Sequence, residues 1–211
     1  MGRTIMLALA ALMLVLAAYA CWPRKADLRG FDPAEMARLE TAMWRDYYDK
    51  RYPALFIHLY ESSRTQFGFS PLASLRIALS AAQAARTFQP TRSLAEAEAA
   101  IPDLVTYYGL LRQAAPVAFD PQEVAARELD WWQARRESIG PQDYGVTIGQ
   151  VAALTYGKAQ DEPALRAFGI GRAEAMAYRD ARGQAITQKD WSAIETQLRG
   201  AYQQLKAGIG K

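Results

Sequence analysis

The sequence predicts an all-α protein in which an N-terminal apolar helix precedes a bundle of about eight helices. Two observations predict the bundle: the composition is rich in Ala with few β-branched runs, and helix-start and helix-stop residues recur along the chain. Ala favours helices because it loses no side-chain entropy on entering one. A third observation, an uncharged run near the amino terminus, predicts the apolar helix.

The composition is that of one well-cored domain with an appendage. Of the 211 residues, 51% are hydrophobic and 22% are charged, which is far from the composition of a disordered chain. The 25 basic residues nearly balance the 22 acidic ones. This near-balance argues against a nucleic-acid binder, which would gather its basic residues on one patch.

The apolar run extends from Ile5 to Trp22 and holds 18 consecutive residues without a charge. At about 1.5 Å per residue it is roughly 27 Å long, near the minimum that spans a bilayer core. We therefore expect residues 1–22 to form a membrane anchor or signal segment, followed by a linker over residues 23–30 and a helical domain over residues 31–211.

Three fates of this segment remain open. An uncleaved anchor would place Trp22 at the membrane interface and end its helix at Pro23. Cleavage after the small residues around Ala20 would leave Cys21 at the mature N-terminus, where a bacterial lipoprotein carries its lipid. Plain secretion is the third. The lone Cys21 forms no intramolecular disulfide in any of the three cases.

The orientation of an anchored domain is also open. Arg24, Lys25 and Arg29 come after the apolar run and only Arg3 precedes it, an asymmetry that favours a cytoplasmic domain. An N-terminal segment of this shape nevertheless usually exports the domain attached to it. We expect a single-pass protein of the bacterial inner membrane whose domain faces the periplasm.

Helix starts share one pattern, in which a capping side chain precedes a proline or an acidic residue. Asp32-Pro33 and Asp120-Pro121 each place a capping carboxylate before a proline at the first helical position. Ser70, Ser93 and Thr187 begin helices in the same way, and Gly or Pro residues mark the ends. The predicted helices span residues 33–51, 53–67, 71–88, 94–115, 121–138, 144–157, 163–182 and 188–207.

Two stretches at an offset of 88 positions resemble each other, FDPAEMARLETAMW from residue 31 and FDPQEVAARELDWW from residue 119. The identical columns are Phe31/Phe119, Asp32/Asp120, Pro33/Pro121, Glu35/Glu123, Ala37/Ala125, Glu40/Glu128 and Trp44/Trp132. An internal duplication would give halves at residues 31–116 and 119–208. Convergence on a common helix start is the alternative, because the first four columns carry little beyond capping.

Capping does not explain the pair Glu40 and Glu128. Each has apolar neighbours at all four helical contacts, where an unpaired carboxylate would be costly. Arg76 and Arg172 lie in largely apolar surroundings on the third helix of each half, and they are the expected partners. Such a cluster either fixes helix register or faces a ligand.

The stretch ALFIHLYESSRTQFG carries a second candidate. His58, Glu61, Ser62 and Thr65 share one face of a helix, so Glu61 is placed to orient His58 as a general base. A hydrogen-bonded structural histidine is the simpler interpretation. A di-metal bundle site would need Glu-x-x-His on two helices, and the chain has one histidine, so we expect no metal and no cofactor.

These features suggest two alternative functions. The first is a tethered interaction or scaffold module of the bacterial cell envelope, with a protein partner and no catalysis of its own. The second is an enzyme or small-ligand binder whose site lies between the halves and includes Glu40, His58, Glu61 and Glu128.

Overall fold

The structure, a computed structural model, describes residues 2–22, 24 and 26–210, and the all-α prediction is confirmed: this part of the chain contains no strand. Pro23 and Lys25, on which the anchor and orientation predictions partly depend, lie outside the described residues. The helices after the apolar segment are α2 (Pro33–Tyr48), α3 (Tyr52–Thr65), α4 (Pro71–Phe88), α5 (Leu94–Ala97), α6 (Ile101–Ala114), α7 (Pro121–Arg136), α8 (Pro141–Tyr156), α9 (Pro163–Arg182) and α10 (Gln188–Ile209), with short 3₁₀ turns η1 (Glu98–Ala100) and η2 (Gly183–Ala185).

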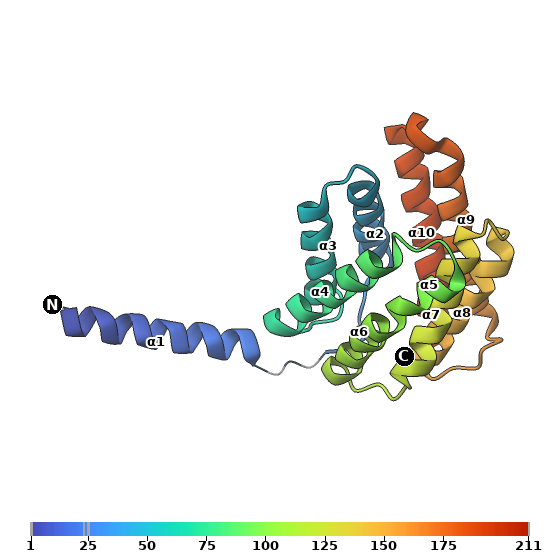
Figure 1. Ribbon diagram of the computed structural model, residues 1–211. Coiled ribbons are helices and arrows are strands. Elements are labelled where there is room, and N and C mark those ends of the chain that lie inside the picture. Colours follow the sequence, from blue (N-terminus) through green and yellow to red (C-terminus); the bar gives the residue numbers. More distant parts are fainter. Residues whose placement is uncertain (1, 23, 25, 211) are drawn as a thin grey trace.

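The apolar helix α1 (Gly2–Cys21) extends away from the bundle (Figure 1). The side chains that the structure describes on it are exposed almost throughout, including Leu7, Met13 and Leu14. The window Thr4–Cys21 is long and apolar enough to cross a membrane, a property that a signal sequence shares. The chain therefore carries one apolar helix that the rest of the described structure leaves uncovered.

The predicted helix over residues 94–115 is divided. A proline at the second position of α6, Pro102, cannot donate the hydrogen bond that a continuous helix would require there. The turn η1 joins α5 to α6 at this place. The helix predicted over residues 144–157 begins earlier than expected. In the structure it is α8, which starts at Pro141, three residues before Tyr144.

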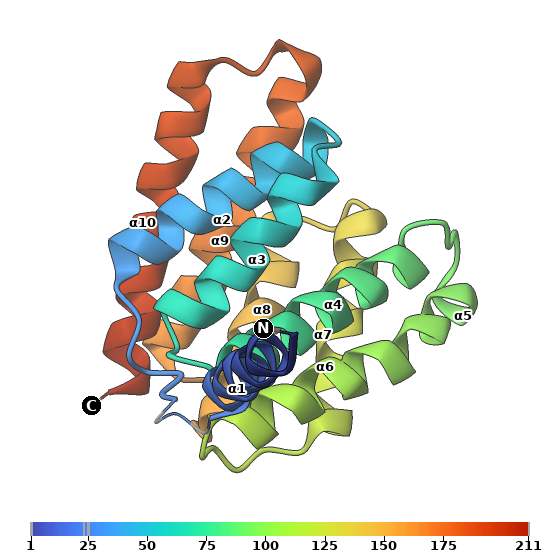
Figure 2. The ribbon, with the colours of Figure 1, turned by 90° about the vertical axis from the view of Figure 1, so that its left-hand side faces the viewer.

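The helices of the domain form a closed ring. Each long helix from α2 to α9 packs against the next long helix along the chain, and α10 completes the ring by packing against α2. Figure 2 shows α10 beside α2. This circular order leaves the middle of the ring bordered by helices from both halves of the chain.

Helices α8 and α9 approach most closely because glycines face each other across them. A Cβ added at Gly169 would lie 2.0 Å from the carbonyl oxygen of Gly145 and 2.4 Å from the amide nitrogen of Gly149. Any side chain there would push the two helices apart. Helices α8 and α9 are therefore closely packed against each other in the second half of the chain.

The segment predicted as a linker belongs partly to the domain. Ala26 and Leu28 are buried. The hydroxyl of Tyr156 donates to the carbonyl oxygen of Leu28 at 2.9 Å, and the amide of Asp27 donates to the carbonyl oxygen of Phe67 at 3.0 Å. The chain is thus fixed to the bundle before α2 begins.

The first helices of the two halves end alike as well as begin alike. Lys50 and Ser138, 88 positions apart, both take the left-handed conformation, with φ of 58° and 60°. The amide after each one donates back to a helix carbonyl, from Arg51 to Asp46 at 2.8 Å and from Ile139 to Ala134 at 3.1 Å. The repeat therefore continues beyond the helix-start residues.

The last helices of the halves also correspond, at an offset of 94 positions. Ser93 caps α5, which leads through η1 into α6, and Thr187 caps α10. Arg112 of α6 donates to the carbonyl oxygen of Phe119 at 3.3 Å, and Lys206 of α10 donates to that of Phe31 at 2.9 Å; each Phe precedes the next helix in the ring. Six buried positions coincide: Ala97/Trp191, Ala100/Ile194, Leu104/Leu198, Tyr108/Tyr202, Leu111/Leu205 and Ala115/Ile209. The two predicted halves thus share features beyond the helix start, and the duplication stays a prediction.

Candidate functional site

A pocket of about 650 Å³ lies in the middle of the ring, bordered by α2, α3, α4, α7 and α9. We call it the central pocket. Its walls are mostly aromatic and aliphatic, with charged side chains at a few points. The aromatic members are Trp44, Tyr47, Tyr48, Tyr52, Phe56, Trp131 and Trp132, and the charged members are Glu40, Arg86, Glu128, Arg135 and Arg172.

Glu40 is fully compensated at the edge of this pocket. The Nε and a terminal nitrogen of Arg172 both donate to its Oε1, at 2.7 and 2.6 Å, and the hydroxyl of Tyr202 donates to its Oε2 at 2.6 Å. Glu40 is 3% exposed. The structure thus joins Glu40 and Arg172 in the buried pair that the sequence suggests.

Glu128 has different surroundings. The hydroxyl of Tyr108 donates to its Oε2 at 3.0 Å, and the indole nitrogen of Trp132 donates to its Oε1 at 2.9 Å. Glu128 is half-buried, and it belongs to none of the ion pairs among the described residues. The prediction that Glu128 is buried against an arginine is therefore wrong, because it is half-buried and a neutral donor binds each of its two oxygens.

Arg76 lies outside this site, contrary to its predicted burial. It is exposed on the outer face of α4, where its apolar neighbours Leu72, Leu75 and Leu79 are exposed as well. The apolar residues around Arg76 thus form a surface row. Apolar helical neighbours alone did not distinguish a buried face from an exposed one.

The buried faces of α4 and α9 show which residue replaces the arginine. The four buried residues of α4 coincide with buried residues of α9 at an offset of 91 positions: Ser74/Leu165, Ile77/Phe168, Ala78/Gly169 and Ala84/Ala175. Two further buried residues of α9, Ala173 and Met176, have exposed counterparts on α4. In this register the counterpart of Arg172 is Ala81, which also lines the central pocket. The half that contains α4 therefore has a methyl group where the other half has a guanidinium.

Electrostatic coupling links the polar groups of the pocket. Burial is the largest single influence on the pKa of Arg172 and acts to lower it, but Glu40, Tyr202 and, to a smaller extent, Glu128 together raise the pKa above its usual range. Burial, followed by the adjacent carboxylate, raises the pKa of both Tyr108 and Tyr202. Both hydroxyls therefore stay protonated at neutral pH and act as donors to the carboxylates.

The predicted stripe of His58, Glu61, Ser62 and Thr65 is not one site. Nδ1 of His58 lies 2.8 Å from Oδ2 of Asp46, so Asp46 and not Glu61 orients the ring. The hydroxyl of Ser62 donates to the backbone of its own helix. None of these side chains lines the central pocket.

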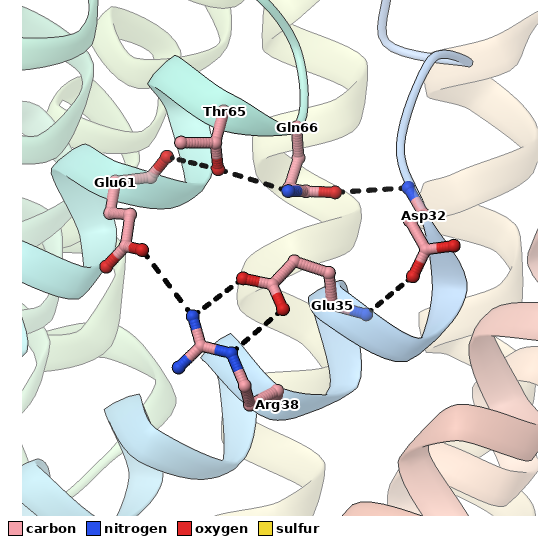
Figure 3. Close-up of polar contacts among 6 residues, drawn as sticks. All are labelled: Asp32, Glu35, Arg38, Glu61, Thr65 and Gln66. Atoms are coloured by element: carbon pink, nitrogen blue, oxygen red, sulfur yellow. Dashed lines mark hydrogen bonds and ion pairs between the residues drawn. The ribbon is translucent and has the colours of Figure 1, made fainter.

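Glu61 and Thr65 instead belong to polar contacts on the outside of α2 and α3 (Figure 3). Glu61 accepts from a terminal nitrogen of Arg38 at 3.5 Å, and the Thr65 hydroxyl donates to the Glu61 carbonyl oxygen at 2.9 Å. The side-chain oxygen of Gln66 accepts a hydrogen bond from the backbone amide of Asp32 at 3.1 Å. These groups connect the start of α2 to the end of α3, which is a structural role.

Asp46 and Arg135 are polar residues that the sequence reasoning missed. Asp46 is 3% exposed and accepts from Arg51 at 2.8 Å as well as from His58. Arg135 donates to Asp180 at 2.8 Å and to the Tyr48 hydroxyl at 2.8 Å. Neither stands among apolar helical neighbours on all sides, so a test based on local apolarity does not find them.

The remaining candidates do not assemble further chemistry in the described part of the chain. No three His, Cys, Asp or Glu side chains there come close enough together to hold a metal ion. Cys21 is exposed at the end of α1, and its lipidation stays a prediction. No family model, curated protein or solved structure matches the chain.

Proposed function

We propose that this protein binds a small organic molecule in the central pocket and is held at a membrane by α1. The pocket is the observation that carries the proposal. Its volume of about 650 Å³ suits a small ligand, and ligand sites are typically apolar hollows with a few oriented polar groups. Glu40 and Glu128, two of the four residues expected in a site between the halves, line it.

Binding is favoured over turnover by the hydrogen bonds that the pocket carboxylates already make. Both oxygens of Glu40 accept from Arg172 and Tyr202, so Glu40 lacks the hydrogen-bond access to a substrate proton that a general base needs. One hydrogen bond to each oxygen of Glu128 fixes its orientation and leaves acceptor positions for a ligand. Oriented carboxylates between aromatic walls suit recognition of a ligand better than proton transfer.

A blocked-pocket variant tests this function. Ala82 is an exposed residue of α4 that lines the pocket, and Ala82→Trp is designed to obstruct it. Gln83→Trp places the same side chain at the adjacent exposed position, which does not line the pocket, as a control. Native mass spectrometry of the full-length protein from detergent-solubilised membranes should detect a small-molecule adduct in the wild type and the control. The adduct should be absent from Ala82→Trp. Identical spectra for all three proteins would contradict the function.

The membrane location is proposed from the exposed apolar length of α1. A single-pass protein of the bacterial inner membrane with a periplasmic domain would fractionate with membranes and resist extraction by salt. Cys21→Ala should leave this association unchanged. Full-length protein found in the soluble fraction without detergent contradicts an anchor, and loss of association in Cys21→Ala would instead indicate lipidation.

A tethered interaction module is the second candidate function. It is favoured by the exposed row of Leu72, Leu75 and Leu79 on α4, with exposed fractions of 39%, 39% and 53%. Leu75→Asp with Leu79→Asp should then remove cross-links to a partner protein in membranes while the pocket adduct persists. Unchanged cross-links would exclude this row as an interaction surface.

A further inference from the structure

We propose that the ligand of the central pocket is an organic cation with an apolar body, whose guanidinium or ammonium group binds Glu128. The inference rests on the proposed function and names the chemical class of its ligand. It comes from the different partners of the two corresponding carboxylates, Glu40 and Glu128.

The first step is the arginine that one half lacks. Glu40 is bound by Tyr202 from the last helix of the other half and by Arg172 from α9. Glu128 is bound by the equivalent tyrosine, Tyr108, but the counterpart of Arg172 is Ala81. The place that a guanidinium fills beside Glu40 is therefore left to the pocket beside Glu128.

The second step is the charge of the pocket wall. Arg172 forms a two-nitrogen ion pair with Glu40, and it is the only guanidinium among the described residues that pairs with either pocket glutamate. Arg135 pairs with Asp180. Arg86 is exposed in the last turn of α4 and joins none of the ion pairs of the described chain. The half-buried Glu128 carboxylate thus has no ion-pair partner among the described residues, and a cationic ligand would supply one.

The third step is the hydrogen-bonding capacity that remains on Glu128. Each of its oxygens accepts one hydrogen bond, from Tyr108 at 3.0 Å or from Trp132 at 2.9 Å. An ionised carboxylate offers about four acceptor positions, so roughly two stay available to a ligand. A guanidinium or ammonium group supplies the matching donors.

The fourth step is the aromatic wall. The guanidinium of Arg172 already lies over the ring of Trp131, 5.3 Å from its centre, so the pocket holds one cation against an aromatic face. Trp44 and Trp132 supply further faces. The apolar body of the ligand would lie against Leu55 and Phe56 of α3.

Binding of short probes to the full-length chain in nanodiscs of zwitterionic lipid tests the inference, with empty nanodiscs as the blank. The probes are hexylguanidinium, hexanol and hexanoate, measured by tryptophan fluorescence. The wild type should bind hexylguanidinium about tenfold more tightly than hexanol, as one charge-assisted hydrogen bond allows. Hexanoate should bind most weakly.

Two variants should remove the preference for hexylguanidinium over hexanol in different ways. Glu128→Gln should equalise hexylguanidinium and hexanol, whereas Glu123→Gln, at an exposed acid of the same helix, should behave as wild type. Ala81→Arg should supply the cation internally and abolish binding of hexylguanidinium.

The outcomes separate this inference from the proposed function. Equal binding of hexylguanidinium and hexanol by the wild type would overturn the cationic ligand, and so would stronger binding of hexanoate. The proposed binding function would still be supported if the small-molecule adduct is lost in Ala82→Trp. A preference that survives Glu128→Gln would also overturn it. Failure of all three probes overturns the cationic ligand, and an adduct that persists in Ala82→Trp overturns the function itself.

Discussion

Glu40 and Glu128 occupy corresponding positions on α2 and α7, yet their hydrogen-bond and ion-pair partners differ. A tyrosine from the last helix of the opposite half donates to each one, Tyr202 to Glu40 and Tyr108 to Glu128. Only Glu40 also receives an arginine. Both glutamates line the central pocket, but Glu40 does so as part of an ion pair, whereas Glu128 does so with neutral donors alone. We propose that the difference comes from one position on another helix, Arg172 on α9 and Ala81 on α4.

A repeated helix therefore specifies the place of a carboxylate but not its partner. The apolar neighbours of Glu40 and Glu128 lie on their own helices, whereas Arg172 comes from α9. A buried charge that loses its partner is costly, so the two halves should respond differently to loss of their glutamates.

Replacement of the glutamates should produce the largest effect. Glu40→Ala leaves the half-buried Arg172 without its ion-pair partner, and we expect the free energy of unfolding to fall by about 3 to 5 kcal/mol. Glu128→Ala removes two hydrogen bonds from neutral donors, and about 1 to 3 kcal/mol should be lost. Urea denaturation in mild detergent measures both. Equal losses would show that the two sites are energetically alike.

Alkaline pH should reveal the tyrosines that donate to these carboxylates. The pKa of Tyr108 and Tyr202 is raised in the folded protein, so each hydroxyl ionises in the unfolded chain first, near pH 10. Their contribution is complete below pH 10 and is lost as pH rises above it, by about 1.4 kcal/mol per pH unit for each tyrosine. The urea concentration at the unfolding midpoint should fall with rising pH between pH 9 and 11, and it should fall less steeply in Tyr202→Phe than in the wild type. The same dependence on pH in both proteins would contradict the role of Tyr202.

The ends of α2 and α7 should show the smallest and most equal effects. Lys50 and Ser138 are exposed and hold positive φ, which glycine adopts without strain. Lys50→Gly and Ser138→Gly should each raise the free energy of unfolding by about 0.5 to 1 kcal/mol. Thermal unfolding compares them. A gain in one half and a loss in the other would indicate that these ends are not equivalent.

The fold could be predicted largely from helix caps because a cap acts within a few residues of its own position. Asp32, Asp120, Ser70, Ser93 and Thr187 all cap the helices that they were expected to begin. The break between α5 and α6 shows the limit, since Pro102 divides a helix that the apolar pattern treats as one.

The site could be predicted only in part because its partners lie far apart in the sequence. Local apolarity correctly singled out Glu40 and Arg172, which are 132 positions apart and meet through the closure of the ring. The same test failed for Arg76, because an apolar helical face can also be a surface. Nothing in the spacing of His58 points to Asp46, which comes from another helix.

The cationic ligand depends on one feature, namely that no arginine or lysine of the described chain forms an ion pair with Glu128, where position 81 holds an alanine. A double-mutant cycle tests this feature, with the free energy of unfolding measured for wild type, Ala81→Arg, Glu128→Gln and the double variant. We expect a favourable coupling of about 1 to 3 kcal/mol between the introduced guanidinium and the Glu128 carboxylate. A coupling close to zero would mean that position 81 does not face Glu128, and it would contradict the proposed equivalence of Ala81 and Arg172.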